Sequence, residues 1–231
     1  MVSHTLTLRT DNIILFIKYD DGQHVAHPTT FILRANYNGY PMTKAQLRKQ
    51  FLAKRKNLCL HDLQKQSQAI RQQFFQRFDL RQIKTLHIFL PILKQNEINT
   101  QIIIQEIFQH YPQITLITSK SHFQTCTMDS YILKSHTQIT ENRWGIPEPI
   151  NAIFCSDDII DMVLIPLLGF DQHGFRVGYG KGFYDRFLQK CRTDVIKVGL
   201  SLFEPVDKID DVNEYDVKMD FCVMSEGVWE G

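Results

Sequence analysis

The sequence predicts a single α/β domain in three layers, a mostly parallel sheet with helices on both faces, over residues 42–231. Three observations favour this fold class. Short apolar segments alternate with segments whose apolar residues recur at helical spacing, as in repeated βαβ units. The segment DMVLIPLL (Asp161–Leu168) is apolar from Met162 onward and stops at Gly169, as expected of a buried strand. The 231 residues are 43% hydrophobic and 22% charged, which allows one sizeable core.

Residues 1–41 differ from the rest of the chain. They contain short alternating apolar segments and scattered histidines, and they end in a turn-like Asn38-Gly39-Tyr40-Pro41. We expect an N-terminal extension of uncertain structure here, and Met42 is a candidate for the native start. The alternative is a real strand or hairpin appended to the domain.

Two helices are expected at the start of the domain. Thr43 is a suitable N-cap, and Leu47, Phe51 and Leu58 follow it at near-helical spacing with basic residues between them. Residues 61–78 form the second helix, which has a glutamine-rich outer face.

Strands and helices then alternate along the chain. Strands are expected at Thr85–Pro91, Ile114–Ser119, Asp161–Leu168 and Val195–Phe203, and helices at Thr100–His110 and at about Gly182–Cys191. This order of elements is what predicts a mostly parallel sheet.

Composition argues against several classes of protein. The net charge of +1 leaves no global field that would attract nucleic acid or an anionic membrane. No apolar run approaches the roughly 20 residues that cross a bilayer, and no secretory signal is evident. The five cysteines never form a Cys-x-x-Cys pair, which favours free thiols in a reducing compartment. We expect a cytoplasmic monomer that acts on small molecules.

The stretch RVGYGKGFYDRF (Arg176–Phe187) carries three glycines at alternate positions before a predicted helix. Glycine is costly inside regular structure, so this spacing suggests a loop whose backbone amides approach phosphate oxygens. Arg176 and Lys181 would add positive charge. The loop is neither a Walker A motif nor a dinucleotide fingerprint, because Phe183 follows Gly-Lys and no final G-x-x-G step occurs. A tight strand-to-helix turn without a ligand is the alternative.

Other charged residues join this loop as candidates. Asp185 lies in the first turn of the predicted helix, where its carboxylate would hold Mg²⁺ or merely complement the helix dipole. Lys44 and Arg48 lie four residues apart on one helix face, where they would grip a phosphate chain or form a solvated basic face.

Four further carboxylates are candidate ligands, and the alternative for each is an ordinary surface charge: Glu97, Glu148, Asp216 and Asp220. The nine histidines show no spacing typical of a zinc site, and no Gly-x-Ser-x-Gly motif is present.

The run LIPLLGFDQHGFRVGYGKGFYDRFL (Leu164–Leu188) resembles the signature of the 5-formyltetrahydrofolate cyclo-ligase family, whose members are also called methenyltetrahydrofolate synthetases. Four further motifs are similar to the family pattern and occur in the same order: KAQLR at Lys44–Arg48, EINT at Glu97–Thr100, WGIPEP at Trp144–Pro149 and NEYDVKMD at Asn213–Asp220. The resemblance spans about Met42–Ser225. Phe183 stands where the family commonly has tyrosine, and SLFEP (Ser201–Pro205) lacks a glutamine that many members carry there.

The resemblance implies residue roles. ATP would be bound by Lys44, Arg48, Arg176, Val177, Gly178, Tyr179, Gly180, Lys181, Gly182, Phe183 and Tyr184. The folate would contact Arg48, Leu90, Glu97, Tyr179, Gly180, Lys181, Gly182 and Phe183. Asp185 and Asp216 would hold Mg²⁺, and Arg176 and Lys181 would be catalytic.

The implied reaction is the ATP-dependent closure of 5-formyltetrahydrofolate to 5,10-methenyltetrahydrofolate, with release of ADP and phosphate through an iminium phosphate. Such chemistry needs positioning and charge neutralisation more than an acid–base pair. Two alternatives stay open: a binding module that retains the pocket without turnover, and a phosphotransferase that uses the same loop on another acceptor.

Overall fold

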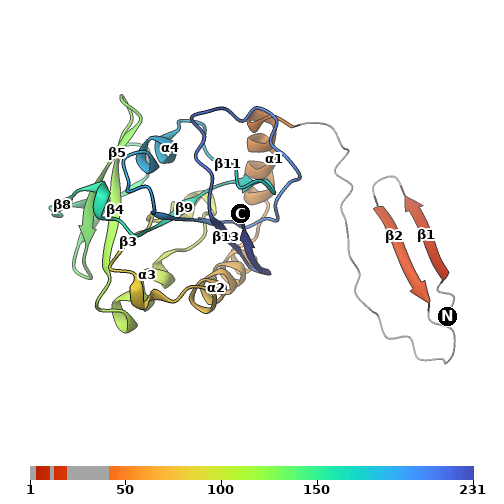
Figure 1. Ribbon diagram of the computed structural model, residues 1–231, viewed down its shortest axis with the longest axis horizontal. Helices are drawn as coiled ribbons and strands as arrows, with labels where there is room; N and C mark the ends of the chain where they lie inside the picture. The colour runs from red at the N-terminus through yellow and green to blue at the C-terminus, as the bar shows by residue number, and fades with distance from the viewer. Residues whose placement is uncertain (1–3, 11–12, 20–41) are drawn as a thin grey trace. The chain divides into compact units, whose positions relative to one another are not determined.

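The computed structural model describes residues 4–10, 13–19 and 42–231, which fall into two separate units. In the first unit, β1 (His4–Thr10) pairs antiparallel with β2 (Ile13–Tyr19). These strands correspond to the hairpin alternative for the N-terminal segment, and the rest of that segment lies outside the described residues. The second unit is the domain that carries every candidate site residue (Figure 1).

The domain is organised around an eight-stranded sheet with the order β14-β13-β12-β9-β3-β4-β5-β8. Its strands are β3 (Thr85–His87), β4 (Thr115–His122), β5 (Thr127–Leu133), β8 (Phe154–Cys155), β9 (Met162–Pro166), β12 (Ile196–Leu200), β13 (Phe221–Met224) and β14 (Gly227–Glu230). The run from β13 to β4 is parallel throughout, whereas β14 and β5 pair antiparallel with their neighbours. The predicted fold class is confirmed.

Helices cover both faces of this sheet (Figure 1). The helices α2 (Leu60–Arg77) and α3 (Gln101–His110) bury Phe74 and Ile107 against residues such as Leu164 of β9. On the opposite face, α4 (Phe183–Leu188) buries Phe187 against the alternate β9 position Ile165. Because successive side chains of a strand point to opposite faces, the apolar run in β9 serves both cores.

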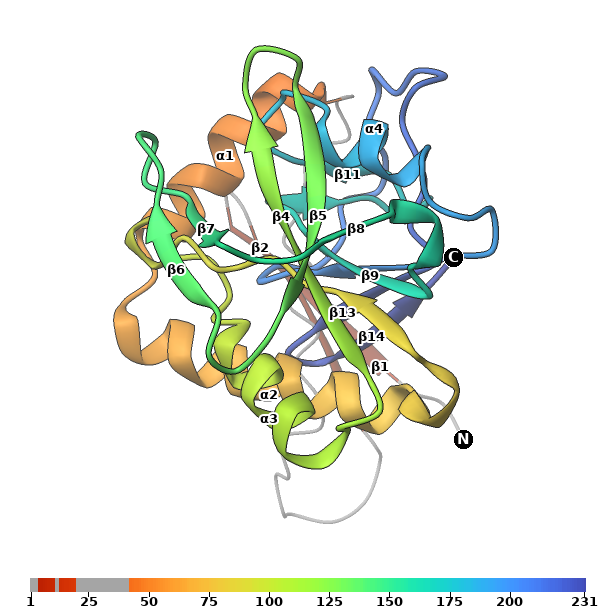
Figure 2. The same ribbon diagram turned by 90° about the vertical axis from the view of Figure 1, so that its left-hand side faces the viewer.

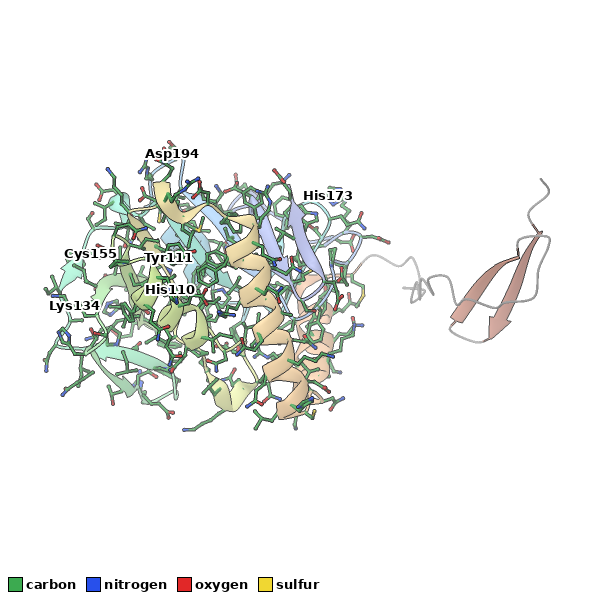
Figure 3. All side chains as sticks on the ribbon, turned by 90° about the horizontal axis from the view of Figure 1, so that it is seen from below. His110, Tyr111, Lys134, Cys155, His173 and Asp194 are labelled. Atoms are coloured by element: carbon green, nitrogen blue, oxygen red, sulfur yellow. The ribbon has the colours of Figure 1, made fainter. Side chains whose placement is uncertain are left out.

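The C-terminal end of α3 is joined to α2 by aromatic packing. Tyr111, labelled in Figure 3, caps α3 and stacks on Phe75 of α2, with ring centroids 5.6 Å apart and an interplanar angle of 12°. Such a stack adds to the area that the two rings bury.

The helix α1 (Lys44–Lys56) forms a smaller core away from the main sheet. Thr43 is its N-cap, as predicted, and Gln46 completes a capping box. Leu47 and Phe51 pack against the short hairpin β10 (Gly169–Phe170) and β11 (Arg176–Val177) and against the 206–209 segment. The backbone nitrogen of Lys44 also donates to Asp211 Oδ1 at 2.6 Å, across 167 residues of sequence.

The inner stripe of α1 differs from the predicted one. The helix ends at Lys56, so its third buried position is Arg55, and Leu58 lies beyond the helix with only partial burial. A guanidinium therefore occupies the place where sequence periodicity suggests an aliphatic side chain.

Some predicted boundaries and some strands also differ. The strand expected at 85–91 stops at His87, because the chain leaves the ladder there, and α4 is shorter than the expected helix. The sequence did not indicate β5, β8, β13 or β14, nor the arm formed by β6 (Gln138–Glu141) and β7 (Pro147–Ile150), which lies beside the β4–β5 hairpin (Figure 2).

Three short 3-10 turns complete the domain: Leu80–Gln82, Leu93–Gln95 and Asp157–Ile159. All five cysteines are free, among them Cys155 on β8 (Figure 3). Among the described residues, no helix combines the length and apolarity needed to cross a bilayer.

Candidate active site

A cavity of about 980 Å³ opens beyond the carboxyl ends of β3, β4 and β9, where α/β sheets commonly bind ligands. Fourteen of the predicted site residues line it: Lys44, Arg48, Leu90, Glu97, Arg176, Gly178, Tyr179, Gly180, Lys181, Gly182, Phe183, Tyr184, Asp185 and Asp216. Val177 does not. Its side chain is buried in the α1 core, and its carbonyl accepts a hydrogen bond from the Leu168 amide at 2.8 Å. The structure thus brings together segments that are up to 172 residues apart.

The glycine loop combines a tight turn with open space. Gly180 and Gly182 have φ angles of +89° and +67°, in the left-handed region that favours glycine. A Cβ on Gly180 would lie 3.0 Å from the Arg48 guanidinium, whereas a Cβ on Gly178 would meet nothing within 4 Å. Turn geometry therefore explains two of the glycines, and the third leaves room at the cavity wall.

Two arginines hold the backbone of this loop. Arg48 Nε donates to the Gly178 carbonyl at 2.8 Å, and Arg186 Nη1 donates to the carbonyls of Lys181 and Gly182 at 2.8 and 3.1 Å. Because guanidinium groups already bind these carbonyl oxygens, the loop can present its amides and positive charge to the cavity. Lys181 is exposed, and no ion pair involves it within the described part of the chain.

Arg176 is the buried cation of the site, with 7% of its side chain exposed. Its Nη2 donates to Asp185 Oδ1 at 2.5 Å, and its Nη1 donates to the Val217 carbonyl. Burial lowers the pKa of Arg176, and the carboxylates of Asp185 and Asp216 act in the opposite direction. In the absence of ligand its two terminal nitrogens are thus occupied by protein groups.

Asp216 is held in a similar way. It forms an ion pair with Lys44 Nζ, and its Oδ2 accepts from the Asn213 amide at 2.7 Å. The pair joins the first turn of α1 to the 213–216 loop, so the two ends of the domain meet at the cavity.

The two carboxylates fit a magnesium ion of a particular kind. Among the described residues, no group of three or more His, Cys, Asp or Glu side chains is arranged to hold a metal. Mg²⁺, however, is usually bound by one or two carboxylates together with substrate phosphates and water. Asp185 and Asp216 both line the cavity and both lie near Arg176, so they suit an ion that arrives with phosphate.

Glu97 also lines the cavity, and only 5% of it is exposed. Its Oε1 accepts from the Tyr179 hydroxyl at 2.6 Å, and its Oε2 accepts from the Ile92 amide at 2.8 Å. Burial raises the pKa of Glu97, while these hydrogen bonds and the nearby Arg55 act to lower it. Glu97, a candidate ligand in the sequence, lies in the loop that follows β3 and lines the cavity, although its side chain is almost fully buried.

An aromatic wall, formed by Phe123, Trp144 and Phe183, also lines the cavity. Phe123 stacks on Trp144 with ring centroids 3.6 Å apart, and meets Phe183 edge-on at 5.3 Å. Arg143 lies over the Trp144 ring at 3.9 Å. This wall is suited to a flat heteroaromatic ring, which stacks on such faces.

Several residues of the site were not indicated as site residues by the sequence, among them Arg55, His87, Phe123 and Trp144. Phe123 lies in the β4–β5 turn, where no local pattern signals a cavity. His87 is fully buried, with its Nε2 2.7 Å from Ser119 Oγ and its Nδ1 without a hydrogen-bond partner. Desolvation lowers the pKa of His87 to about 3, so the ring is neutral at pH 7.

The remaining two carboxylates have structural partners. Glu148 Oε1 accepts from the Ser121 amide and from Asn142 Nδ2, each at 2.9 Å, which joins the β6–β7 arm to the sheet. Asp220 Oδ2 accepts from the Lys197 amide at 2.7 Å. Neither residue lines the cavity.

Comparison with known proteins agrees with this geometry. The model of the 5-formyltetrahydrofolate cyclo-ligase family matches residues 41–225. The 5-formyltetrahydrofolate cyclo-ligase of Mus musculus is 29% identical over 188 residues, covering 77% of this chain and 91% of the mouse protein. That of Mycoplasma pneumoniae is 28% identical over 187 residues, covering 80% of this chain and all of the relative.

Solved structures give the same result. The 5,10-methenyltetrahydrofolate synthetase of Aquifex aeolicus superposes with a TM-score of 0.69 at 25% identity, over 82% of this chain and 93% of the other. The synthetase of Mycoplasma pneumoniae superposes with a TM-score of 0.64 at 26% identity, over 80% and 99%. The chain therefore belongs to the 5-formyltetrahydrofolate cyclo-ligase family, and the prediction of a ligase that forms a carbon–nitrogen bond is confirmed.

Proposed function

We propose that this protein closes 5-formyltetrahydrofolate to 5,10-methenyltetrahydrofolate with consumption of ATP and release of ADP and phosphate, in a Mg²⁺-dependent reaction. The observation that carries the proposal is the composition of the cavity of about 980 Å³. Its lining combines cations and the carboxylates of Asp185 and Asp216 with the buried Glu97 and the aromatic wall. The cations and the two carboxylates suit a phosphorylated nucleotide with its metal ion. Glu97 and the aromatic wall suit a reduced folate.

The reaction begins with a formyl oxygen, which is a poor leaving group. Transfer of the γ-phosphoryl group to that oxygen forms an O–P bond and breaks the bond to ADP, which leaves an iminium phosphate at N5. The N10 amine then attacks the formyl carbon and loses its proton, and phosphate departs with its bonding electrons. No protein nucleophile is required, so the protein acts by positioning and by neutralising charge.

The phosphate chain is assigned to the glycine loop and the cations around it. Amides of Gly178–Tyr184 approach the phosphates, with Lys44 and Arg48 on the side of α1. Lys181 is exposed at the cavity and supplies positive charge to the transferring group. Arg176 is assigned to the same step, and when phosphate is bound its guanidinium is shared between Asp185 and that phosphate.

Asp185 and Asp216 would hold Mg²⁺, which neutralises phosphate charge when it is bound. Both carboxylates have a cationic partner in the protein, Lys44 for Asp216 and Arg176 for Asp185, and these partners hold the carboxylates in place. Such pairing suits a metal site that fills together with the nucleotide.

The folate is assigned to Glu97 and the aromatic wall. The folate ring stacks on the aromatic wall, which includes Phe183. Leu90 supplies an apolar contact, and Glu97 accepts hydrogen bonds from nitrogens of the folate ring. Arg48 and the Tyr179–Phe183 backbone lie between the two substrates. Phe183 retains a stacking surface without the hydroxyl that tyrosine would have there.

The test is formation of the methenyl product, followed by its near-ultraviolet absorbance, with purified protein, 5-formyltetrahydrofolate, ATP and Mg²⁺. Lys181→Ala should lower turnover while the thermal midpoint stays close to that of the wild type. Asp185→Asn should lower turnover and also the midpoint, since it removes the negative charge beside the buried Arg176. Lys65→Ala is a matched control, since Lys65 is exposed on α2 and outside the cavity. No ATP-dependent product from folded protein, alongside an active cyclo-ligase control, would contradict the proposal.

The same preparation separates the alternatives. Tight folate binding by calorimetry without turnover would support a binding module. ADP release with an acceptor other than the folate would support another phosphotransferase.

We further propose a monomer in the cytoplasm whose active unit is residues 42–231. Light scattering during size-exclusion chromatography tests the first point. The intact mass of the protein from its native source tests whether residues 1–41 are translated.

A further inference from the structure

Arg55 is a buried cation for which neither the family resemblance nor the proposed reaction gives a role. It follows Leu47 and Phe51 on the inner face of α1, and only 4% of it is exposed. Burying a guanidinium is costly unless it is paired and hydrogen-bonded, so its partners indicate its purpose.

These partners are two groups of the cavity. Arg55 Nη2 donates to the Tyr179 hydroxyl at 2.5 Å, and Arg55 Nη1 lies 4.0 Å from Glu97 Oε1. The guanidinium carbon is also 5.4 Å from the centre of the Tyr179 ring. Tyr179 in turn donates to Glu97 at 2.6 Å. The three side chains form one chain of hydrogen bonds, from α1 through the glycine loop to the 92–98 loop.

A second contact links the same two backbone segments. Asn96 adopts a left-handed conformation with φ of 52°, and its Nδ2 donates to the carbonyls of Arg55 and Leu58 at 3.1 and 3.2 Å. The end of α1 and the Glu97 loop are therefore fixed together without Arg55. What the Arg55 side chain adds is the attachment of Tyr179, a residue that is 44% exposed at the cavity and would have no other anchor than Glu97.

We propose that Arg55 is a positioning residue, which holds Tyr179 of the glycine loop against Glu97 and thereby shapes the folate side of the cavity. This inference rests on the proposed function, since it assumes that Glu97 and Tyr179 face the folate. Arg55 itself lies behind these residues and does not line the main cavity.

The proposal makes removal of Arg55 selective. Without the guanidinium, the Tyr179 hydroxyl loses its donor and the loop is held to Glu97 by one hydrogen bond. The Lys44–Asp216 ion pair and the hydrogen bond from Arg48 to Gly178 stay intact, because Lys44 and Arg48 lie in the first two turns of α1. Folate binding should weaken more than nucleotide binding, because only some of the loop's contacts with the nucleotide depend on Tyr179.

A pH profile gives a second readout. The charged and titratable groups that face Glu97 are Arg55 from α1, Tyr179 from the glycine loop and, at longer range, Tyr184 of α4. Arg55 is the cation among them, so its loss favours the protonated form of Glu97. The acidic limb of kcat/KM for the folate should move to higher pH.

The experiment compares Arg55→Met, Arg55→Lys, Tyr179→Phe and the double variant Arg55→Met/Tyr179→Phe with the wild type. We expect the KM for 5-formyltetrahydrofolate to rise about tenfold in Arg55→Met, as for one lost charge-assisted hydrogen bond, and the KM for ATP to rise distinctly less. Lysine keeps the charge without the planar fork, so Arg55→Lys should recover the acidic limb better than the KM. The double variant should be little worse than either single one, because both remove the same link.

Lys56→Met is the matched control, since Lys56 is the adjacent exposed cation on α1. Hydrogen exchange of the amides of residues 178–182 supplies a readout that needs no turnover. It should be faster in Arg55→Met and Tyr179→Phe than in the wild type and in Lys56→Met. If Arg55→Met does not fold, Tyr179→Phe and Arg55→Lys still test the link.

Equal loss of affinity for folate and ATP would overturn the proposal, as would independent, multiplying effects in the double variant or unchanged hydrogen exchange. A wild-type protein without cyclo-ligase turnover would refute the proposed function instead. In that case the exchange data still decide whether Arg55 orders the loop.

Discussion

The buried imidazole of His87 predicts a specific acid sensitivity of the folded domain. Its pKa is about 3 in the folded protein, because desolvation disfavours the imidazolium, against 6.5 for the exposed side chain. Between pH 3 and pH 6.5, His87 is therefore protonated in the unfolded chain but neutral in the folded chain. The stability that the neutral ring provides is fully present above pH 6.5 and is lost as the pH falls toward 3.

The magnitude follows from the two pKa values. Each pH unit below 6.5 costs about 1.4 kcal/mol of unfolding free energy, so His87 accounts for a loss of about 2 kcal/mol between pH 7.5 and pH 5. His87→Leu is close in volume and does not titrate. Urea unfolding of the wild type and this variant across that range should show the variant losing about 2 kcal/mol less.

Other groups titrate over the same range, so the difference between the two proteins is the quantity to examine. Ser119→Ala is the control, since it removes the hydroxyl that contacts His87 Nε2 but leaves the imidazole buried. Parallel pH dependence of the unfolding free energy in the wild type and His87→Leu would refute the reasoning.

The other predictions concern the cavity. Gly178→Ala should fold with an almost unchanged thermal midpoint yet bind nucleotide more weakly in calorimetry, because its methyl group points into space that the ligand needs. Gly180→Ala should instead lower the thermal midpoint, because the left-handed φ of residue 180 costs alanine about 1 kcal/mol or more and the added Cβ meets Arg48. Equal midpoints for Gly178→Ala and Gly180→Ala would contradict this prediction. Trp144→Ala should raise the KM for the folate by about tenfold with little effect on that for ATP, and Trp144→Phe should restore most of the loss, as stacking requires. Chelation of Mg²⁺ should abolish turnover reversibly without unfolding the protein, and circular dichroism would check the fold. Turnover that persists in the presence of chelator would exclude the proposed metal role of Asp185 and Asp216.

The fold was predictable where the chain is periodic. The helices α2 and α3 and the strands β9 and β12 carry their pattern locally, through apolar spacing and clear boundaries. The strands β8 and β14 carry little signal, because they are edge strands of only two and four residues. The strand β5 buries Met128, Ser130 and Leu133, so no regular alternation of apolar residues marks it in the sequence. In α1 the spacing suggested Leu58, but the helix ends before it and Arg55 fills the inner position.

The candidate site divides in the same way. The glycine loop, Asp185 and the Lys44–Arg48 pair are motifs with a local spacing, so their residues were identified before their arrangement was known. Phe123 and Arg55 reach the site through a hairpin turn and a helix face, and only the tertiary structure brings them there. Val177 fell within the motif yet faces the core, since alternate residues of a strand point in opposite directions.

The contacts between α1 and the 209–216 segment have a consequence for biosynthesis. Met42 pairs with Ile209, and Lys44 reaches Asp211 and Asp216 across 167 and 172 residues, so the first helix of the domain finds its partners almost at the end of the chain. While the ribosome is still translating the central strands, the cationic face of α1 has no docking partner. The part of the cavity between Lys44 and Asp216 is therefore completed only when nearly the whole domain has emerged, and contacts of such long range make this a late step of folding.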